Sequence, residues 1–159
     1  MMLTFAVLQG PNMNRLGLRK PEIYGTATLE DVRNDLEKQA VDLECKLRHF
    51  QSNHEGGLID WLQKQLGSID GIICNPAGLT NYGLSLRDAL SDADIPVAIV
   101  HLSNVHAREE WRRNDIFAEI ATIYVAGMGW FGYRHALQGL KEIHRSGMNA
   151  SPANSLRSN

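Results

Sequence analysis

Hydrophobic residues are grouped along this chain in short runs, and amphipathic segments separate the runs. Five of the runs have the length of β-strands and are bounded by polar or turn-forming residues. We therefore expect five strands. They cover Leu3–Leu8, Lys46–Phe50, Gly71–Cys74, Val97–His101 and Thr122–Ala126.

The segments between these runs carry apolar residues at spacings of three and four, which is typical of helices. The first helix is predicted to begin after Thr28, an N-cap residue with Asp31 in the capping-box position. Further helices are predicted near residues 58–66, 84–90 and 130–143. This alternation predicts an α/β fold, and at this length we expect a flavodoxin-like five-stranded parallel sheet of order 2-1-3-4-5 with helices on both faces.

The amino-acid composition is that of an ordinary globular protein. Of the 159 residues, 43% are hydrophobic and 21% are charged, and the net charge is −2. We expect one domain over residues 1–147 and a disordered polar tail over residues 148–159. The charge offers no basic surface for nucleic acid, and no apolar run approaches the roughly 20 residues that span a membrane.

The location of the protein is predicted from its cysteines and its amino terminus. Cys45 and Cys74 lie in or beside predicted strands, as expected for reduced thiols. The first residues, MMLTFAVLQG, are apolar but lack a basic leader and a cleavage site, so they predict a strand and not a signal peptide. We therefore expect a cytoplasmic protein.

Ligands of parallel α/β sheets bind beyond the carboxyl ends of the strands. Polar segments follow three of these ends: QGPNMNRLGLRKPEIYG, NPAGLTNYG and HLSNVHAREEWRR, after the first, third and fourth strands. The opposite ends of the strands have no comparable cluster. The functional site is therefore predicted at the carboxyl edge, with the long connection of residues 9–27 as a lid.

Several residues in these segments have two interpretations. An arginine beside a tyrosine lowers the tyrosine pKa and makes it a base, so Arg19 and Tyr24 form a candidate pair, and a solvated Arg19 is the alternative. Asn75 either presents its amide to a ligand or closes an Asx turn before proline. His101, at the tip of a buried strand, is either functional or a hydrogen-bonded structural histidine.

Two further patterns concern charge and metals. Arg108 and Arg112 are four residues apart, so on a short helix they would share one face, which is either solvated or grips an anionic or hydroxylated ligand. His101 and His106 are five residues apart and lack a ligand-spaced cysteine or third histidine. No metal site is therefore expected.

Taken in order, the three polar segments resemble the signature segments of the type II 3-dehydroquinate dehydratase family. The similarity runs from Leu3 to His144, and its patterns GPNxNxLGxRxPxxYG and HLSNxHAREE are long and specific. The resemblance implies a flavodoxin-like fold, a homo-oligomer built of trimers (a dodecamer) and a small-molecule substrate. It also implies dehydration of 3-dehydroquinate to 3-dehydroshikimate without metal or organic cofactor.

The resemblance assigns the base side of this reaction to the first segment. Tyr24 matches the base that removes the proton at C2 of the substrate, and Arg19 matches the lid arginine that favours its phenolate. Asn12 matches the residue that holds a water against the enolate oxygen, where negative charge develops. All three residues agree with the family pattern.

The resemblance assigns the acid side and most substrate contacts to the later segments. His101 matches the general acid that protonates the departing C1 hydroxyl. Asp88 matches a residue that reaches into the site of a neighbouring subunit. Other substrate-binding positions implied by the resemblance are Asn75, Asn81, Leu102, Ser103 and Arg112.

The chain departs from the family mainly on this acid side. The family usually has Glu-x-His, with the glutamate hydrogen-bonded to the histidine, but Ile99 stands at the glutamate position. Asn81 replaces a histidine that also touches the substrate. His101 is therefore predicted to work without its usual carboxylate, and whether another side chain replaces it stays open. Dehydration is then expected to be slow, and the double change Ile99→Glu with Asn81→His is expected to raise it.

Two other functions fit the same residues. One is an enzyme of the same fold that acts on a related cyclic hydroxy acid, because Asn81 reshapes the wall of the site that recognises the substrate hydroxyls. The other is a non-catalytic binding or scaffold protein, which the intact pair of Tyr24 and Arg19 disfavours.

Overall fold

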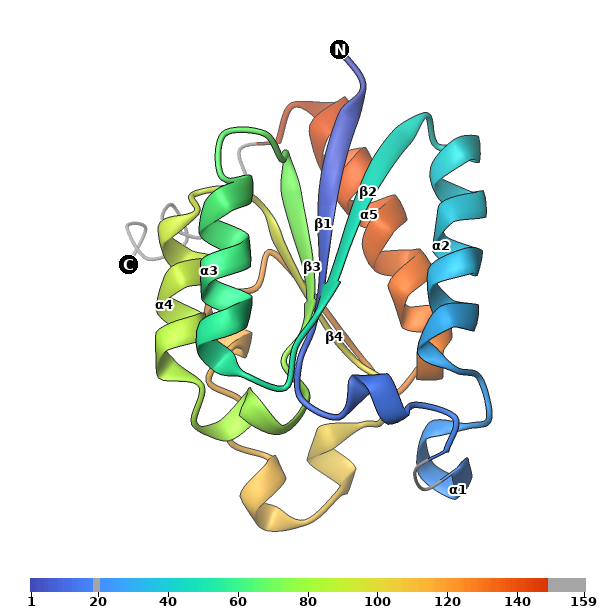
Figure 1. Cartoon of the computed structure of the whole chain (residues 1–159), viewed down its shortest axis with the longest axis vertical. Helices are drawn as coiled ribbons and strands as arrows, with labels where there is room; N and C mark the ends of the chain where they lie inside the picture. Colours follow the sequence, from blue (N-terminus) through green and yellow to red (C-terminus); the bar gives the residue numbers. More distant parts are fainter. Residues whose placement is uncertain (19–20, 149–159) are drawn as a thin grey trace.

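A five-stranded parallel sheet forms the centre of the computed structural model, which describes residues 1–18 and 21–148 (Figure 1). The strand order is β2-β1-β3-β4-β5, with parallel pairing throughout, so the predicted fold and topology are confirmed. Each predicted strand is found to within one residue at either end. The strands are β1 (Leu3–Gln9), β2 (Cys45–Gln51), β3 (Gly71–Asn75), β4 (Val97–His101) and β5 (Ile123–Ala126).

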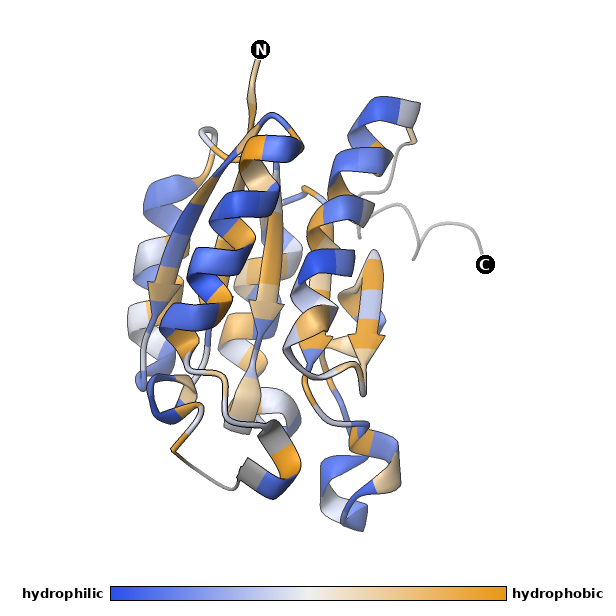
Figure 2. Cartoon of the chain, turned by 90° about the vertical axis from the view of Figure 1, so that its right-hand side faces the viewer, coloured by the Kyte–Doolittle hydropathy of each residue, from blue (hydrophilic) through white to orange (hydrophobic). Residues whose placement is uncertain are grey.

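Helices cover both faces of the sheet (Figure 1). The helices α2 (Leu29–Asp42) and α5 (Gly132–Ser146) lie on one face, and α3 (Glu55–Gln65) and α4 (Leu84–Asp92) lie on the other. Figure 2 shows that α2 carries a polar outer surface with apolar residues interspersed, as its predicted spacing requires. A short helix, α1 (Pro21–Tyr24), lies in the connection after β1.

Short 3-10 helices complete the connections. They are η1 (Met13–Arg15), η2 (Ala77–Asn81), η3 (Val105–Ala107), η4 (Glu110–Arg112), η5 (Ala118–Ile120) and η6 (Gly129–Phe131). Four of them, η1 to η4, follow the carboxyl ends of β1, β3 and β4, where the polar segments of the sequence lie.

The predicted start of α2 is confirmed. Thr28 is the N-cap: its hydroxyl accepts a hydrogen bond from the backbone N–H of Asp31 at 3.1 Å, and the carboxylate of Asp31 accepts from the backbone N–H of Thr28 at 2.8 Å. This capping box satisfies two backbone donors of the helix end. It fixes the point at which the connection of residues 9–27 ends.

Strand alternation gives the sheet two separate cores. Val7, Ile73 and Val100 pack toward α2 and α5, whereas Cys74 and Ile99 pack toward α3 and α4. Side chains two residues apart share one face of a strand. His101 therefore leaves β4 on the same side as Ile99, toward the α3 and α4 layer.

The carboxyl ends of β1 and β3 approach each other closely at Gly10. Its backbone N–H donates to the carbonyl of Asn75 at 2.8 Å. A Cβ atom at Gly10 would lie 2.4 Å from the carbonyl oxygen of Pro76, which no side chain tolerates. The glycine of the first polar segment thus lets two strand ends meet at the edge where the site is predicted.

The described part of the chain has no helix long and apolar enough to cross a membrane. The predicted tail of residues 148–159 lies outside the described residues except for Met148.

Candidate active site

A cavity of about 330 Å³ opens at the carboxyl edge of the sheet. Its walls come from the connection after β1, the end of β3 with η2, and the end of β4 with η3 and η4. Most of the residues predicted for the site lie there. The cavity is lined by Asn12, Asn75, Asn81, His101, Leu102, Ser103 and Arg112, together with Arg108 and other residues.

Asn12, which lines the cavity, has an unusual backbone conformation. Its φ angle is 67°, in the left-handed region that asparagine tolerates better than most residues. Its backbone N–H donates to the side-chain oxygen of Asn53 at 2.8 Å. Backbone strain of this kind collects at functional sites because the surrounding structure must impose it.

Asn75 belongs to a buried polar network that joins three elements. Its side-chain NH₂ donates to the hydroxyl of Tyr133 on α5 at 2.9 Å, and that hydroxyl donates to the side-chain oxygen of Gln9 on β1 at 2.6 Å. Burial of Tyr133 raises the pKa of its hydroxyl well above the usual value, so the group stays protonated and able to donate. Gln9 thus anchors this network on β1.

Asn75 also forms the Asx turn that was predicted as its alternative role. Its side-chain oxygen accepts from the backbone N–H of Ala77 at 3.0 Å, which is an Asx turn. Both interpretations therefore hold: the side chain is fixed by the turn and by Tyr133, and it lines the cavity. The amide has a second N–H for a ligand.

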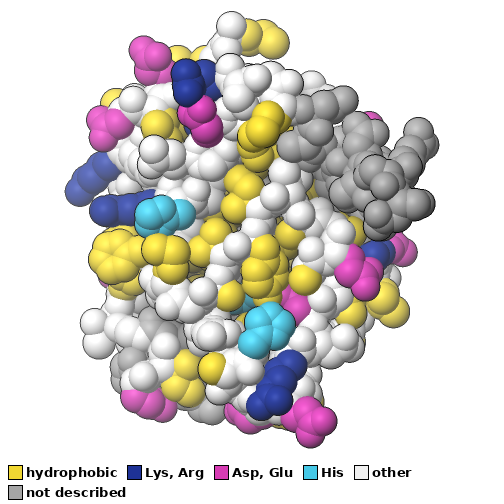
Figure 3. Space-filling model, turned by 180° about the vertical axis from the view of Figure 1, so that it is seen from behind, with side chains coloured by type: hydrophobic (Ala, Val, Ile, Leu, Met, Phe, Trp, Pro, Cys, Tyr) yellow, Lys and Arg dark blue, Asp and Glu magenta, His cyan; other side chains and the backbone are white. Residues whose placement is uncertain are grey.

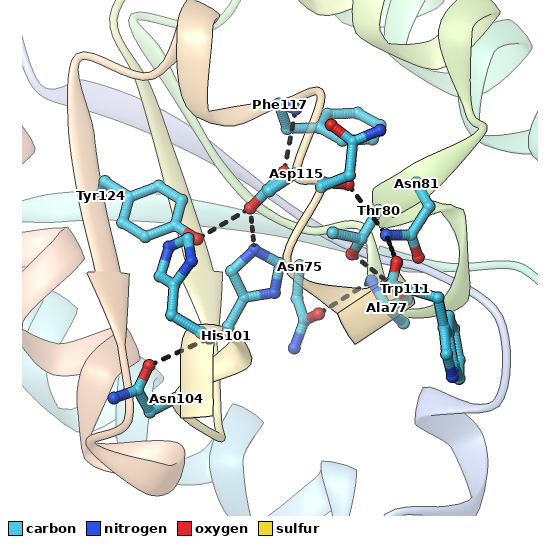
Figure 4. Close-up of polar contacts among 12 residues, drawn as sticks. Asn75, Ala77, Thr80, Asn81, His101, Asn104, Trp111, Asp115, Phe117 and Tyr124 are labelled. Atoms are coloured by element: carbon cyan, nitrogen blue, oxygen red, sulfur yellow. Dashed lines mark hydrogen bonds and ion pairs between the residues drawn. The ribbon is translucent and has the colours of Figure 1, made fainter. Parts of the chain in front are cut away.

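His101 forms a short hydrogen bond with a carboxylate (Figure 4). Its Nε2 lies 2.6 Å from Oδ2 of Asp115, and the two side chains are 5% and 1% exposed. The same oxygen accepts from the hydroxyl of Tyr124 at 2.8 Å, and Oδ1 accepts from the backbone N–H of Phe117 at 2.9 Å. His101 thus lacks the usual glutamate, as predicted, but Asp115 replaces it, so the expectation of a histidine without a stabilising anion was wrong.

This environment favours ionised Asp115. Burial is the largest single influence on the pKa of Asp115 and acts to raise it. The hydrogen bond and charge of His101, and the hydrogen bonds from Tyr124 and the Phe117 backbone, act in the opposite direction. Together they hold the pKa below its usual value. Burial and the neighbouring carboxylate raise the pKa of Tyr124, which remains a donor. The site thus contains a buried carboxylate with three donors around it.

The segment that carries Asp115 is fastened to η2. The side-chain NH₂ of Asn81 donates to the carbonyls of Trp111 at 2.7 Å and Asn114 at 2.8 Å. The backbone N–H of Ile116 donates to the carbonyl of Thr80 at 3.1 Å. Asn81 therefore binds the backbone on the amino-terminal side of Asp115.

Arginines line another part of the cavity. Arg108 donates to the hydroxyl of Ser103 at 3.2 Å, and Arg112 donates to the carboxylate of Glu109 at 2.9 Å while its guanidinium stacks on Trp111 at 4.1 Å from the ring centroid. The predicted shared helix face was wrong, because Arg108 follows η3 and Arg112 belongs to η4. Both residues nevertheless reach the cavity.

The decisive comparison is with the sequences of protein families. The family model described as dehydroquinase class II matches residues 3–141 of this chain. The chain belongs to the class II dehydroquinase family. It is 51% identical over 131 residues to a 3-dehydroquinate dehydratase of Herpetosiphon aurantiacus, covering 82% of this chain and 91% of that protein. It is 45% identical over 136 residues to one of Bacillus subtilis, covering 86% and 92%.

A solved structure of the same family agrees in fold. The type II dehydroquinase of Butyrivibrio crossotus superposes with a TM-score of 0.85 at 35% identity, covering 87% of this chain and 97% of that one. Family membership and fold are thus both established, and the resemblance drawn from the three polar segments is confirmed.

Three of the residues implied by the family pattern are not in the described cavity. Arg19 lies outside the described residues, and so does the side chain of Tyr24, although its backbone ends α1. Asp88 lies on α4, where its carboxylate pairs with Arg87 at 3.2 Å and is 69% exposed. It does not line the cavity of its own chain.

Sequence reasoning missed Asp115 and Tyr124. Asp115 follows His101 by fourteen residues, in a segment without regular periodicity, and Tyr124 reads as an ordinary aromatic residue of β5. The signal that would find Tyr124 is the register of the sheet, which places it opposite Ile99; Asp115 lies in an irregular connection and gives no such signal. Register between β4 and β5 cannot be read from either strand alone.

Proposed function

We propose that the protein is a type II 3-dehydroquinate dehydratase, a lyase that removes water from 3-dehydroquinate to give 3-dehydroshikimate. The observation that carries the proposal is the cavity in which a class II dehydroquinase chain gathers Asn12, Asn75, His101, Ser103 and Arg112. No metal or organic cofactor is assigned to the reaction.

The base side of the mechanism is assigned to the connection after β1. Tyr24, as phenolate beside Arg19, takes the proton at C2, alpha to the ketone. The negative charge then moves to the ketone oxygen, where Asn12 holds a water that donates to the enolate. Electrostatic stabilisation at the point of charge development lowers the barrier to proton removal.

The acid side is assigned to His101. Collapse of the enolate forms the C1–C2 double bond and breaks the C1–O bond, and His101 delivers the proton that turns the leaving hydroxide into water. Its Nε2 is engaged by Asp115, so the proton leaves from Nδ1. Figure 4 shows this second ring nitrogen on the side of Asn75, which lines the cavity.

Substrate binding is assigned to the remaining walls. The backbone N–H of Leu102 and the hydroxyl of Ser103 donate to the substrate carboxylate, and Arg108 next to Ser103 supplies positive charge. Arg112 binds a ring hydroxyl. Asn75, held by its turn and by Tyr133, positions the substrate against His101.

The assembly is assigned to a multiple of trimers, most simply a dodecamer, in which Asp88 reaches a neighbouring site. Two exposed apolar residues shortly before Asp88 in the chain support this: Tyr82 is 65% and Leu84 60% exposed. Figure 3 shows a further band of hydrophobic side chains down the back of the molecule, and the edge strand β5 is only half-buried. Exposed apolar surface of this kind marks subunit contacts.

One assay tests the activity. The pure protein is incubated with 3-dehydroquinate, and the absorbance of the conjugated enone product is followed, with Tyr24→Phe as the control. Steady product formation that is lost in the variant supports the proposal. Binding without turnover would instead favour a non-catalytic protein, and turnover of another cyclic hydroxy acid alone would favour a changed substrate.

A further inference from the structure

We propose that Asp115 is the residue that positions His101 for proton transfer, in place of a carboxylate on β4. The inference rests on the proposed function, because it gives Asp115 a task in catalysis only if His101 is the acid. Asp115 acts through the ring of His101 and does not itself line the cavity. It is thus a positioning residue.

The contacts of Asp115 fix both the carboxylate and the histidine tautomer. An ionised carboxylate only accepts hydrogen bonds, so Tyr124, the Phe117 backbone and Nε2 of His101 must all donate to it. Nε2 then keeps its proton in the neutral ring as well as in the imidazolium. The proton exchanged with substrate is therefore confined to Nδ1, on the other edge of the ring.

The sheet register explains why residue 99 is apolar. Ile99 is fully buried, and in the ladders it stands between Cys74 of β3 and Tyr124 of β5. Because it lies on the same face as His101, a carboxylate at this position would enter the same buried region as Asp115. Two carboxylates there would repel each other, so Ile99 and Asp115 belong to one arrangement.

Asn81 belongs to the same arrangement. Its amide uses both N–H groups on the carbonyls of Trp111 and Asn114, the latter directly before Asp115. A histidine at this position has at most two ring N–H donors, pointing in different directions, and cannot reproduce this clamp. The two departures from the family pattern on the acid side, Ile99 and Asn81, thus have one structural explanation.

The kinetic experiment compares Asp115→Asn with Asp115→Asn/Ile99→Glu. We expect the single change to lower kcat about 10- to 100-fold with little change in KM, because the acid acts in the transition state. The double change moves the carboxylate to the neighbouring strand position and should restore most of the loss. Glu119→Gln, an exposed charge change in the same connection, is the matched control and should behave like wild type.

The position of the ring proton is a readout that a merely structural role would not move. Nε2 of His101 lies 2.6 Å from the carboxylate of Asp115, so the neutral ring should carry its proton on Nε2. In wild type, ¹⁵N NMR of labelled histidine should therefore show neutral His101 protonated on Nε2 and not on Nδ1. In Asp115→Asn this preference should be weaker, because the carboxylate that accepts from Nε2 is gone.

The outcomes separate this inference from the proposed function. Three results would each overturn the inference. They are a wild-type kcat in Asp115→Asn, a loss in Asp115→Asn that Ile99→Glu does not reverse, and a neutral His101 protonated on Nδ1. The NMR measurement on wild type decides even if Asp115→Asn fails to fold. A wild type that does not dehydrate 3-dehydroquinate overturns the proposed function, while NMR still reports whether Asp115 holds the ring.

Discussion

The two sides of the proposed reaction differ in how the chain builds them. The base side comes from one continuous connection between β1 and α2, in which Asn12, Arg19 and Tyr24 lie within thirteen residues. The acid side is assembled from η2, the tip of β4, the connection after η4 and the edge strand β5. Its parts are distant in sequence and meet only through the fold.

This difference teaches where a sequence pattern is informative. A residue of a contiguous motif is either present or changed, and on the base side Asn12, Arg19 and Tyr24 are all present. On the acid side the pattern shows the loss of a glutamate at Ile99 but not the gain of Asp115. The two positions are sixteen residues apart, and Asp115 reaches His101 through an irregular connection. A position that departs from a motif therefore says little until its spatial neighbours are known.

The largest expected effect is on the base side. Tyr24→Phe should lower kcat by roughly 10²–10⁴-fold, because the phenolate base is removed, and Arg19→Ala should lower it strongly as well. Binding of a product-like carboxylic acid, measured by calorimetry, should change less, since neither residue is assigned to the carboxylate. Near-normal turnover in Tyr24→Phe would contradict the assignment of the base.

Much of the fold follows from local pattern alone. The apolar runs gave the five strands, the spacing of three and four gave the helices, and Thr28 with Asp31 gave a helix start. The edge that carries the site also follows, because strand ends of a parallel sheet meet there.

The remaining features required tertiary structure. The double role of Asn75 depends on Tyr133, which lies fifty-eight residues away on α5. The separation of Arg108 from Arg112 depends on two 3-10 turns where one regular helix was expected. The pairing of His101 with Asp115 depends on the path of an irregular connection, which carries no periodic signal.

The next largest effect tests whether the acid side already has its carboxylate. Ile99→Glu in the wild-type background should lower the free energy of unfolding by roughly 3 kcal/mol, because a second carboxylate is buried near Asp115. It should lower turnover as well, which reverses the expectation drawn from the family pattern. Urea unfolding measures the change, and Ile99→Gln, which lacks the charge, should be affected less. A more active Ile99→Glu would show that Asp115 does not fill this role.

The clamp at Asn81 predicts a local effect. Asn81→Ala removes two hydrogen bonds to the segment before Asp115, each contributing about 0.5–1.5 kcal/mol. The backbone amide of Ile116, bonded to Thr80, should then exchange with solvent roughly 5- to 100-fold faster, as measured by hydrogen exchange. Amides of β1 should be unaffected. Equal exchange of Ile116 in the two proteins would mean that Asn81 does not hold the segment.

A smaller effect is expected at Tyr124. Tyr124→Phe removes one of the donors to Asp115 but leaves the bond to His101, so the carboxylate keeps its main partner. We expect a loss of about 1 kcal/mol in the free energy of unfolding and a fall in kcat of only a few-fold, well below that of Tyr24→Phe. Similar losses in the two tyrosine variants would remove the distinction between a base and a supporting donor.

The smallest expected effect concerns Cys74, the neighbour of Ile99 on β3. Burial, and then the charge of Asp115, raise the pKa of its thiol to about 12, so at pH 8 only about 10⁻⁴ of the thiol is ionised. In a Cys45→Ala background, which leaves Cys74 as the single thiol, labelling by a thiol reagent at pH 8 should therefore be no faster than unfolding. The rate is followed by mass spectrometry with and without urea. Fast labelling of the folded protein would show that the acid side opens to solvent, and such opening would contradict the rigid, buried arrangement of Asp115 and His101.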